Sequence, residues 1–280
     1  MHRQVTPIGE LFSLTWTQYK ERAIPLLAVI LINTVLISSL ILVMIVSGIV
    51  GTAILMHFMN DVLAISIIFI ITTLFILVIA LLLVWCQTAM LAIVVDEDLG
   101  IIEAFQRGWE YFWPMTWVLT FLTGILISGF TFGIVPGFLF LVWFSFSIFI
   151  MFDENRRGLD TLLASREYVR GYGWNTFGKM IVAWLISLII GTLPLIGQIL
   201  SMLFTPFFLL YILAIYRDLK SIKGTVELDD APGTRIFWCL VTIIGMIIPI
   251  AALLGVLYFL LTGDQQWMMH TWQGMHGTNL

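Results

Sequence analysis

Long runs without a charged residue dominate this chain and restrict what it can fold into. Ala23–Val50 and Val62–Val95 contain no Asp, Glu, Lys or Arg. Only 11% of all residues are charged and 60% are hydrophobic, whereas a soluble domain has about 25% charged residues. An apolar run of about 20 residues crosses a bilayer as a helix, because a helix satisfies its own backbone hydrogen bonds. The sequence therefore predicts an all-α, polytopic membrane protein.

Seven apolar runs predict about seven spans, and the middle four form two tight pairs. Each pair is broken by a Gly-x-x-Pro motif, at Gly133–Pro136 and at Gly191–Pro194, and both residue types favour turns. The predicted spans are Ala23–Val50, Val62–Val95, Met115–Phe132, Pro136–Phe152, Met180–Leu193, Leu195–Tyr216 and Ile236–Thr262. Because some of these runs are short, a re-entrant hairpin over Met180–Tyr216 is an alternative to two full crossings.

The basic residues predict the orientation of the chain. All 13 Lys and Arg residues lie in four stretches, namely Arg3–Arg22, Arg107, Arg156–Lys179 and Arg217–Arg235. Seven spans place these four stretches on one side of the membrane, which we call the basic side. Basic loops face the cytoplasm, so we expect a cytoplasmic N-terminus and an external C-terminus in the cell inner membrane.

Several classes of function are disfavoured. The net charge of −4 shows no basic excess, which argues against a nucleic-acid partner. The predicted spans contain no Asp, Glu, Lys, Arg or His, whereas ion paths and proton relays usually require such a residue. The chain also lacks the HExxH, GxSxG and P-loop patterns of hydrolases and nucleotide-binding enzymes. We therefore expect no enzymatic activity and no catalytic residue.

An internal repeat is visible at an offset of 57 residues. Asp96-Glu97 matches Asp153-Glu154, and Glu110-Tyr111 matches Glu167-Tyr168. A weaker copy begins near Ile8. Each copy has an amphipathic, interfacial helix followed by a hairpin of two spans, and two spans per copy imply parallel repeats related by rotation about the membrane normal.

The repeats predict a division of the chain into five parts. These are residues 1–95 (repeat 1), 96–152 (repeat 2), 153–216 (repeat 3), 217–235 (a cytoplasmic connector) and 236–280 (a C-terminal span with an outer tail).

The pattern of Asp-Glu, amphipathic helix and Gly-x-x-Pro hairpin over Asp96–Tyr216 resembles a loose group of bacterial and archaeal membrane proteins. This group includes the membrane domain that is fused to some glycerophosphodiester phosphodiesterases. The resemblance implies a membrane module only, since no polar stretch here is long enough to contain the catalytic domain. It implies no active site.

The basic side contains candidate contacts for lipid headgroups. Arginines there can hold phosphate groups, and tryptophans prefer the membrane–water interface. The candidates are Arg156, Arg157, Arg166, Arg170, Trp109 and Trp174. The repeated Asp-Glu pairs could form an acidic site, but we expect them to be N-terminal charges of the interfacial helices, where carboxylates are favourable.

The opposite side contains a cluster of Met and His. These residues are Met56, His57 and Met59 in the first hairpin loop, and Met268, Met269, His270, Met275 and His276 in the tail. Thioether and imidazole groups suit copper, especially Cu(I). A copper site that joins the loop and the tail is one hypothesis, and an unstructured tail with an aromatic belt is the alternative.

We expect a non-enzymatic membrane protein, either an accessory or scaffold subunit or a lipid-interacting module, whose partners are lipids and other membrane-protein subunits. The first alternative is a facilitative transporter of a small solute or lipid, with Asn33 or Gln87 lining a polar path. Such polar groups more often hydrogen-bond between packed helices. The second alternative is copper binding at the outer face.

Overall fold

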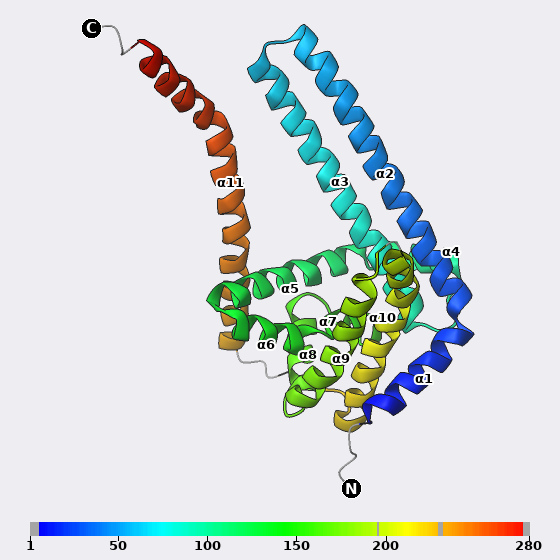
Figure 1. Ribbon diagram of the computed structural model, residues 1–280. Coiled ribbons are helices and arrows are strands. Elements are labelled where there is room, and N and C mark those ends of the chain that lie inside the picture. The colour runs from blue at the N-terminus through cyan, green and yellow to red at the C-terminus, as the bar shows by residue number, and fades with distance from the viewer. Residues whose placement is uncertain (1–5, 195, 229–231, 277–280) are drawn as a thin grey trace. The chain divides into compact units, whose positions relative to one another are not determined.

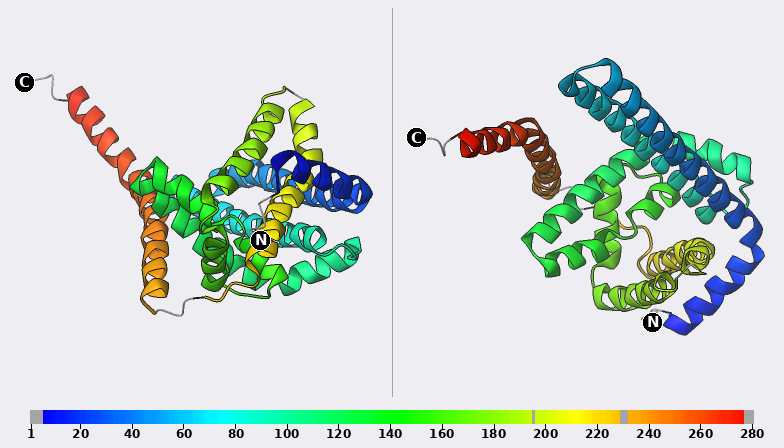
Figure 2. Two further views of the ribbon diagram at one scale, coloured as in Figure 1. Left: turned by 90° about the horizontal axis from the view of Figure 1, so that it is seen from below. Right: turned by 45° about the horizontal axis from the view of Figure 1, so that its top comes forward.

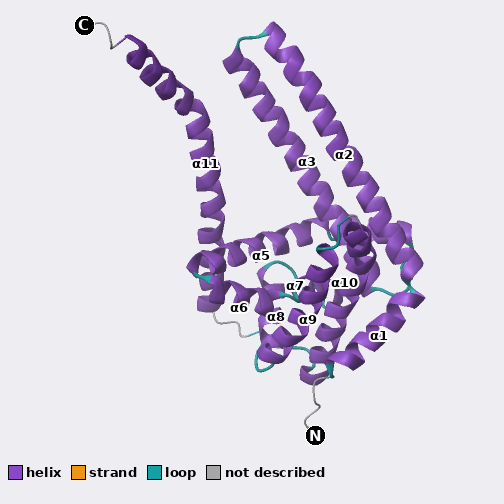
Figure 3. Ribbon diagram, viewed as in Figure 1, coloured by secondary structure: helices purple, strands orange, loops and turns teal. Residues whose placement is uncertain are grey.

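The computed structural model describes residues 6–194, 196–228 and 232–276, and gives only the backbone for residues 61, 62, 232 and 259–276. The described residues form helices joined by short loops, without a strand (Figure 3). Seven helices, counted over these residues, are long and apolar enough to cross a membrane. The protein is therefore an all-α, multi-pass membrane protein, as the sequence predicts.

The helices divide into two compact units. Unit 1 comprises residues 1–119 and 142–228, and unit 2 comprises residues 120–141 and 229–280. This division crosses the predicted repeat limits, since the outer part of the second hairpin groups with the C-terminal helix. The five-part division by repeats stays a prediction.

The order of elements in the first part of the chain is a short helix followed by a long hairpin. Helix α1 (Ile8–Glu21) leads into α2 (Ala23–Phe58) and α3 (Asp61–Val95), which lie side by side (Figures 1 and 2). At about 1.5 Å per residue, the 36 residues of α2 measure about 54 Å. Both helices exceed the thickness of the hydrocarbon core, which is about 30 Å.

The same order recurs twice. Helix α4 (Ile101–Glu110) precedes α5 (Phe112–Phe132), α6 (Ile134–Phe144) and α7 (Ser147–Asp153); α8 (Leu159–Val169) precedes α9 (Gly173–Gly191) and α10 (Ile196–Lys223). The last helix is α11 (Pro232–His276). It continues past Thr262, where the predicted span ends, so the expected outer tail is helical to His276. The rotational relation between the repeats stays a prediction.

Helices α4 and α8 differ in their surroundings. Helix α4 packs on α3 through its small residues: a Cβ atom on Gly108 would lie 2.9 Å from the backbone nitrogen of Ala89. Its other face is exposed and includes Ile102 and Trp109. In contrast, α8 is buried over most of its length, from Thr161 to Ser165 and at its end. Helix α8 is therefore not the exposed interfacial helix that the repeat predicts.

The predicted span Pro136–Phe152 is interrupted between α6 and α7. Ser165 of α8 stabilises this break because its hydroxyl group donates to the carbonyl oxygen of Trp143 (2.7 Å) and accepts from the backbone N–H of Phe146 (3.1 Å). Buried backbone groups need such partners, above all where water is absent. The burial of α8 thus has a structural role that the amphipathic pattern does not indicate.

In unit 2, α11 crosses α5 at a contact of small residues. A Cβ atom on Gly245 would lie 1.9 Å from the carbonyl oxygen of Gly124, and the hydroxyl group of Ser128 donates to the carbonyl oxygen of Val241 at 2.6 Å. Small residues permit this close approach of two membrane helices. They hold the first part of α11 in place.

Candidate functional site

The last two turns of α10, which we call the basic end of α10 (Tyr216–Lys223), connect the ends of several helices in unit 1. Arg217 forms an ion pair with Glu97 (3.1 Å) and donates to the carbonyl oxygen of Val95 (2.9 Å). Val95 is the last residue of α3. Because a helix carries partial negative charge at its C-terminus, Arg217 stabilises the end of α3.

Asp153 and Glu154 at the end of α7 also contact the basic end of α10. The hydroxyl oxygen of Tyr216 lies 2.8 Å from Asp153 Oδ2 and 3.0 Å from Glu154 Oε1. The ammonium group of Lys220 pairs with both carboxylates, at 3.3 Å from Glu154 Oε1. Two helices are thus joined by a cluster of carboxylates, a cation and a phenol.

Glu154 is the most highly connected residue of this cluster. It also accepts a hydrogen bond from the hydroxyl group of Tyr168 on α8 (2.5 Å) and pairs with Arg156 (2.8 Å). Burial opposes ionisation of Glu154, but the bond from Tyr168 and the nearby cations outweigh it and hold the pKa of this carboxyl group below its usual value. Burial and the neighbouring carboxylate raise the pKa of Tyr168. Glu154 is therefore a charged acceptor, and Tyr168 is a donor.

The end of α8 is capped in the same way. The ammonium group of Lys223 donates to the carbonyl oxygens of Glu167 and Arg170, the latter at 2.6 Å. The basic end of α10 therefore places one cation at the C-terminus of each of three helices, α3, α7 and α8. This arrangement is suited to holding helices together.

The structure corrects our interpretation of the repeated Asp-Glu pairs. Asp96 and Asp153 lie at the C-terminal ends of α3 and α7 and do not cap the following helices. Instead, Glu103 accepts from the backbone N–H of Gly100 at the start of α4 (3.0 Å). A carboxylate at a helix C-terminus is unfavourable, and the neighbouring cations offset this cost. Asp96 pairs with Arg107 of α4 (2.7 Å), Glu97 pairs with Arg217, and Asp153 and Glu154 both pair with Lys220.

The sequence does not predict the buried ion pair between Lys179 and Asp218. The ammonium group of Lys179 on α9 lies 3.2 Å from Asp218 Oδ2, and the side chain of Lys179 is only 2% exposed. Thr6, just before α1, donates to Asp218 through its backbone N–H (3.1 Å) and its hydroxyl group (2.7 Å). The predicted span began at Met180 because Lys179 interrupts the apolar run. No spacing rule links Lys179 to Asp218.

The predicted lipid contacts fall into two groups. Trp109 (66% exposed), Trp174 (88% exposed), Arg157 and Arg170 lie at the surface. Arg156, by contrast, is held by Glu154 and by the carbonyl oxygen of Val226, and the guanidinium group of Arg166 lies 5.2 Å from the ring centre of Trp143. Lipid contact by the surface group stays a prediction, whereas Arg156 and Arg166 join segments of the protein.

The Met/His cluster is only partly described. Met56, His57 and Met59 are exposed at the tip of the α2–α3 hairpin. The side chains of Met268, Met269, His270, Met275 and His276 lie outside the described residues. Within the described residues, no group of three or more His, Cys, Asp or Glu side chains could hold a metal ion. Copper binding by Met and His thus stays a prediction.

The two residues considered for a polar path lie in different surroundings. Asn33 is buried, and its amide group donates to the carbonyl oxygen of Cys86 (3.1 Å), so that it joins α2 to α3. Gln87, the residue after Cys86, is exposed on α3. Hydrogen bonds such as that of Asn33 commonly hold membrane helices together.

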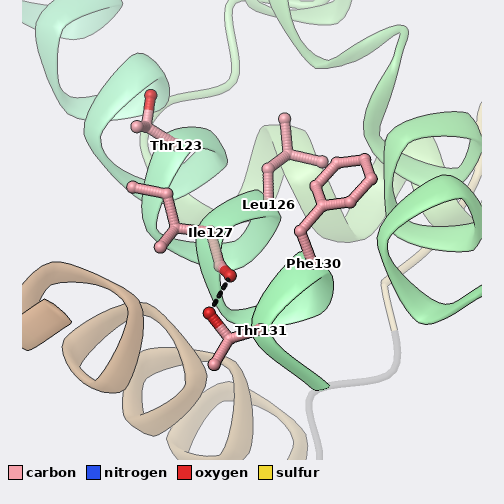
Figure 4. Close-up of a pocket in the computed structure, with 5 residues that line it drawn as sticks. All are labelled: Thr123, Leu126, Ile127, Phe130 and Thr131. Atoms are coloured by element: carbon pink, nitrogen blue, oxygen red, sulfur yellow. Dashed lines mark hydrogen bonds between the residues drawn. The ribbon is translucent and has the colours of Figure 1, made fainter. Parts of the chain in front are cut away.

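A shallow hollow of about 440 Å³ lies on α5 in unit 2. Figure 4 shows the five residues that line it, all of them from this helix: Thr123, Leu126, Ile127, Phe130 and Thr131. The hydroxyl group of Thr131 donates to the carbonyl oxygen of Ile127 in the same helix (2.8 Å). The hollow therefore offers mainly apolar groups to a ligand.

No protein-family model matches this chain, and no curated protein or solved structure is significantly similar to it.

Proposed function

We propose that this chain is a non-enzymatic membrane scaffold that binds lipid at the interface of the basic side and acts as an accessory subunit of a membrane assembly. The observation that carries the proposal is an aromatic surface on α4 and α5. Ile102, Trp109, Trp113 and Trp117 are all exposed there. Such side chains are expensive in water and favourable at the headgroup level.

The position of this surface along α3 supports the proposal. The ring of Trp109 lies 6.2 Å from that of Trp85 on α3. Residues of α3 after Trp85 are largely buried in protein, and those before it are largely exposed. The exposed face of α4 therefore lies at the level where α3 leaves the protein core.

The charged residues support a structural role as well. The cations of the basic end of α10 bind carboxylates and helix-end carbonyl groups of the same chain. Their partners are provided by the fold, which suits a rigid module. We place the module in the cell inner membrane, with the N-terminus inside and the C-terminus outside.

Native mass spectrometry of the protein extracted from its own membrane in a mild detergent tests this function. We expect stoichiometric lipid, and a loss of at least half of it in a Trp109→Ala, Trp174→Ala double variant. Ile250→Ala, at an exposed apolar position of α11, is the matched control and should retain the lipid. Equal lipid retention in all three proteins, or saturable solute flux in proteoliposomes, would contradict the scaffold proposal.

A further inference from the structure

The hairpin of α9 and α10 lies against α1 along much of its length. Thr6 binds Asp218 at one end of α1, and at the other end the hydroxyl group of Tyr19 donates to the carbonyl oxygen of Leu203 (2.8 Å). Between them, the ring of Phe12 lies 4.8 Å from that of Phe207. Helix α1 thus runs antiparallel to residues 203–218 of α10.

Helix α1 has charged residues on its outer surface. Its buried side is Leu11, Thr15 and Tyr19, and its exposed residues include the charged Glu10, Lys20 and Glu21 together with apolar Ile8, Leu14 and Trp16, a mixture typical of a helix at the interface. A charged residue in the centre of a bilayer costs about 2.5–3.5 kcal/mol on insertion scales. Helix α1 therefore lies outside the hydrocarbon core, and residues 203–218 of α10 lie beside it at the same level.

Only a short tip of the hairpin remains to enter lipid. Residues 196–202 of α10 extend beyond Leu203, and seven residues measure about 10 Å. The hydrocarbon core is about 30 Å thick. A full crossing would need about 20 residues in each helix beyond the level of α1.

The exposed apolar side chains mark the same tip. Apart from Trp174, the exposed large apolar residues among those described in this hairpin all fall between Leu185 and Leu203. They are Leu185, Leu188, Ile189, Leu193, Ile196, Ile199 and Leu203. Met180 and Ala183 before the tip are buried, as are Phe207 and Leu210 after it. The apolar surface therefore matches the length that extends beyond α1.

The α2–α3 hairpin of the same unit shows the opposite case. Asn33 binds the carbonyl oxygen of Cys86, and no residue of α2 beyond Asn33 is buried. The 25 residues from Thr34 to Phe58 measure about 37 Å, which is enough for a tilted crossing. This hairpin extends along its own direction well past the tip of α9 and α10 (Figure 1).

From these observations we infer that the α9–α10 hairpin is re-entrant: its tip inserts into the acyl chains of the leaflet on the basic side and returns without crossing. The turn is suited to lipid because the backbone N–H groups of Thr192, Leu193, Ile196 and Gly197 donate to carbonyl groups within the hairpin. This inference goes beyond the proposed function, since it holds for a scaffold and a transporter alike.

Cysteine labelling distinguishes a re-entrant tip from a crossing. In a Cys86→Ala, Cys239→Ala background, Thr192→Cys places a thiol at the exposed tip of α9–α10, and Asn60→Cys places one at the tip of α2–α3. We expect an impermeant maleimide added outside intact cells to label Asn60→Cys and to leave Thr192→Cys at least tenfold less modified. Equal labelling would overturn the inference.

A nitroxide on each thiol removes the ambiguity of an unreactive cysteine. In liposomes, the Thr192 label should be accessible to oxygen and shielded from a water-soluble nickel chelate, at a depth of about 10 Å. Labels at Asn60 and at Glu10→Cys on α1 should be accessible to the chelate. A chelate-accessible label at Thr192, a depth beyond the bilayer midplane, or a lipid-embedded label at Glu10 would each overturn the re-entrant hairpin.

Discussion

Gly245 of α11 lies so close to Gly124 of α5 that a Cβ atom on Gly245 would be 1.9 Å from the Gly124 carbonyl oxygen. No side chain fits between the two backbones at this point. Van der Waals packing and the hydrogen bond from Ser128 to Val241 therefore join these helices. The contact is the means by which the last span is held within unit 2.

Replacing Gly245 with leucine should separate α11 from α5. We expect the Gly245→Leu variant to lose about 1–3 kcal/mol of stability, since an overpacked site must displace backbone. Gly255→Leu is the matched control, because nothing lies within 4 Å of a Cβ atom at Gly255. Thermal unfolding in detergent measures both, and similar losses for the two variants would argue against the contact.

The buried pair of Lys179 and Asp218 should be sensitive to removal of either partner. Lys179→Met and Asp218→Asn each leave a buried group without its partner, which costs about 3–5 kcal/mol. The double variant should lose less than the sum of the single losses, as a double-mutant cycle shows. Arg170→Gln is the contrasting variant, because the ion pair of Arg170 with Glu167 is long (3.5 Å) and the Arg170 side chain is 76% exposed. This variant should lose less than about 1 kcal/mol of stability. Additive losses would contradict a coupled pair.

Acid should destabilise the protein through Glu154. Because the folded-state pKa of this group is lowered, its contribution is fully present above the unfolded value of about 4.3. The contribution is lost as the pH falls through the lower folded value. Unfolding temperatures measured from pH 7 down to pH 3 should therefore fall less steeply in Glu154→Gln than in the wild type. Glu227→Gln, at an exposed position, should follow the wild type, and a parallel decline in Glu154→Gln would refute the assignment.

The orientation of the chain can be tested with two thiols in the same cysteine-free background. Gly277→Cys should react with an impermeant maleimide in intact cells, and Thr225→Cys should react only after lysis. Thr225 lies next to Gly224, whose φ of +71° would strain a cysteine at that position, and Thr225 itself is exposed. The reverse pattern of labelling would exclude a cytoplasmic N-terminus.

Much of the architecture could be predicted from the sequence, because long apolar runs identify membrane helices. Val95 as the end of α3, the turn before Pro136 and the seven candidate spans all follow from the lack of charge and from proline and glycine. Boundaries were less accurate where polar residues continue a helix, as at Gly173–Lys179 of α9. Contacts with other parts of the protein stabilise this polar part of the helix, which would be unfavourable in lipid.

The partners of the charged residues depended on tertiary structure. The positions of Lys and Arg in the sequence predict which loops share one side of the membrane. A charged residue is unfavourable in lipid whatever its tertiary neighbours are, so the sequence suffices for this prediction. That Arg217 caps α3, that Lys220 pairs with Asp153, and that Lys179 is buried with Asp218 depend on which helices are neighbours. Hydropathy determines that a segment is apolar. Whether it faces lipid or protein is decided by packing, and this is why α4 is exposed whereas α8 is buried.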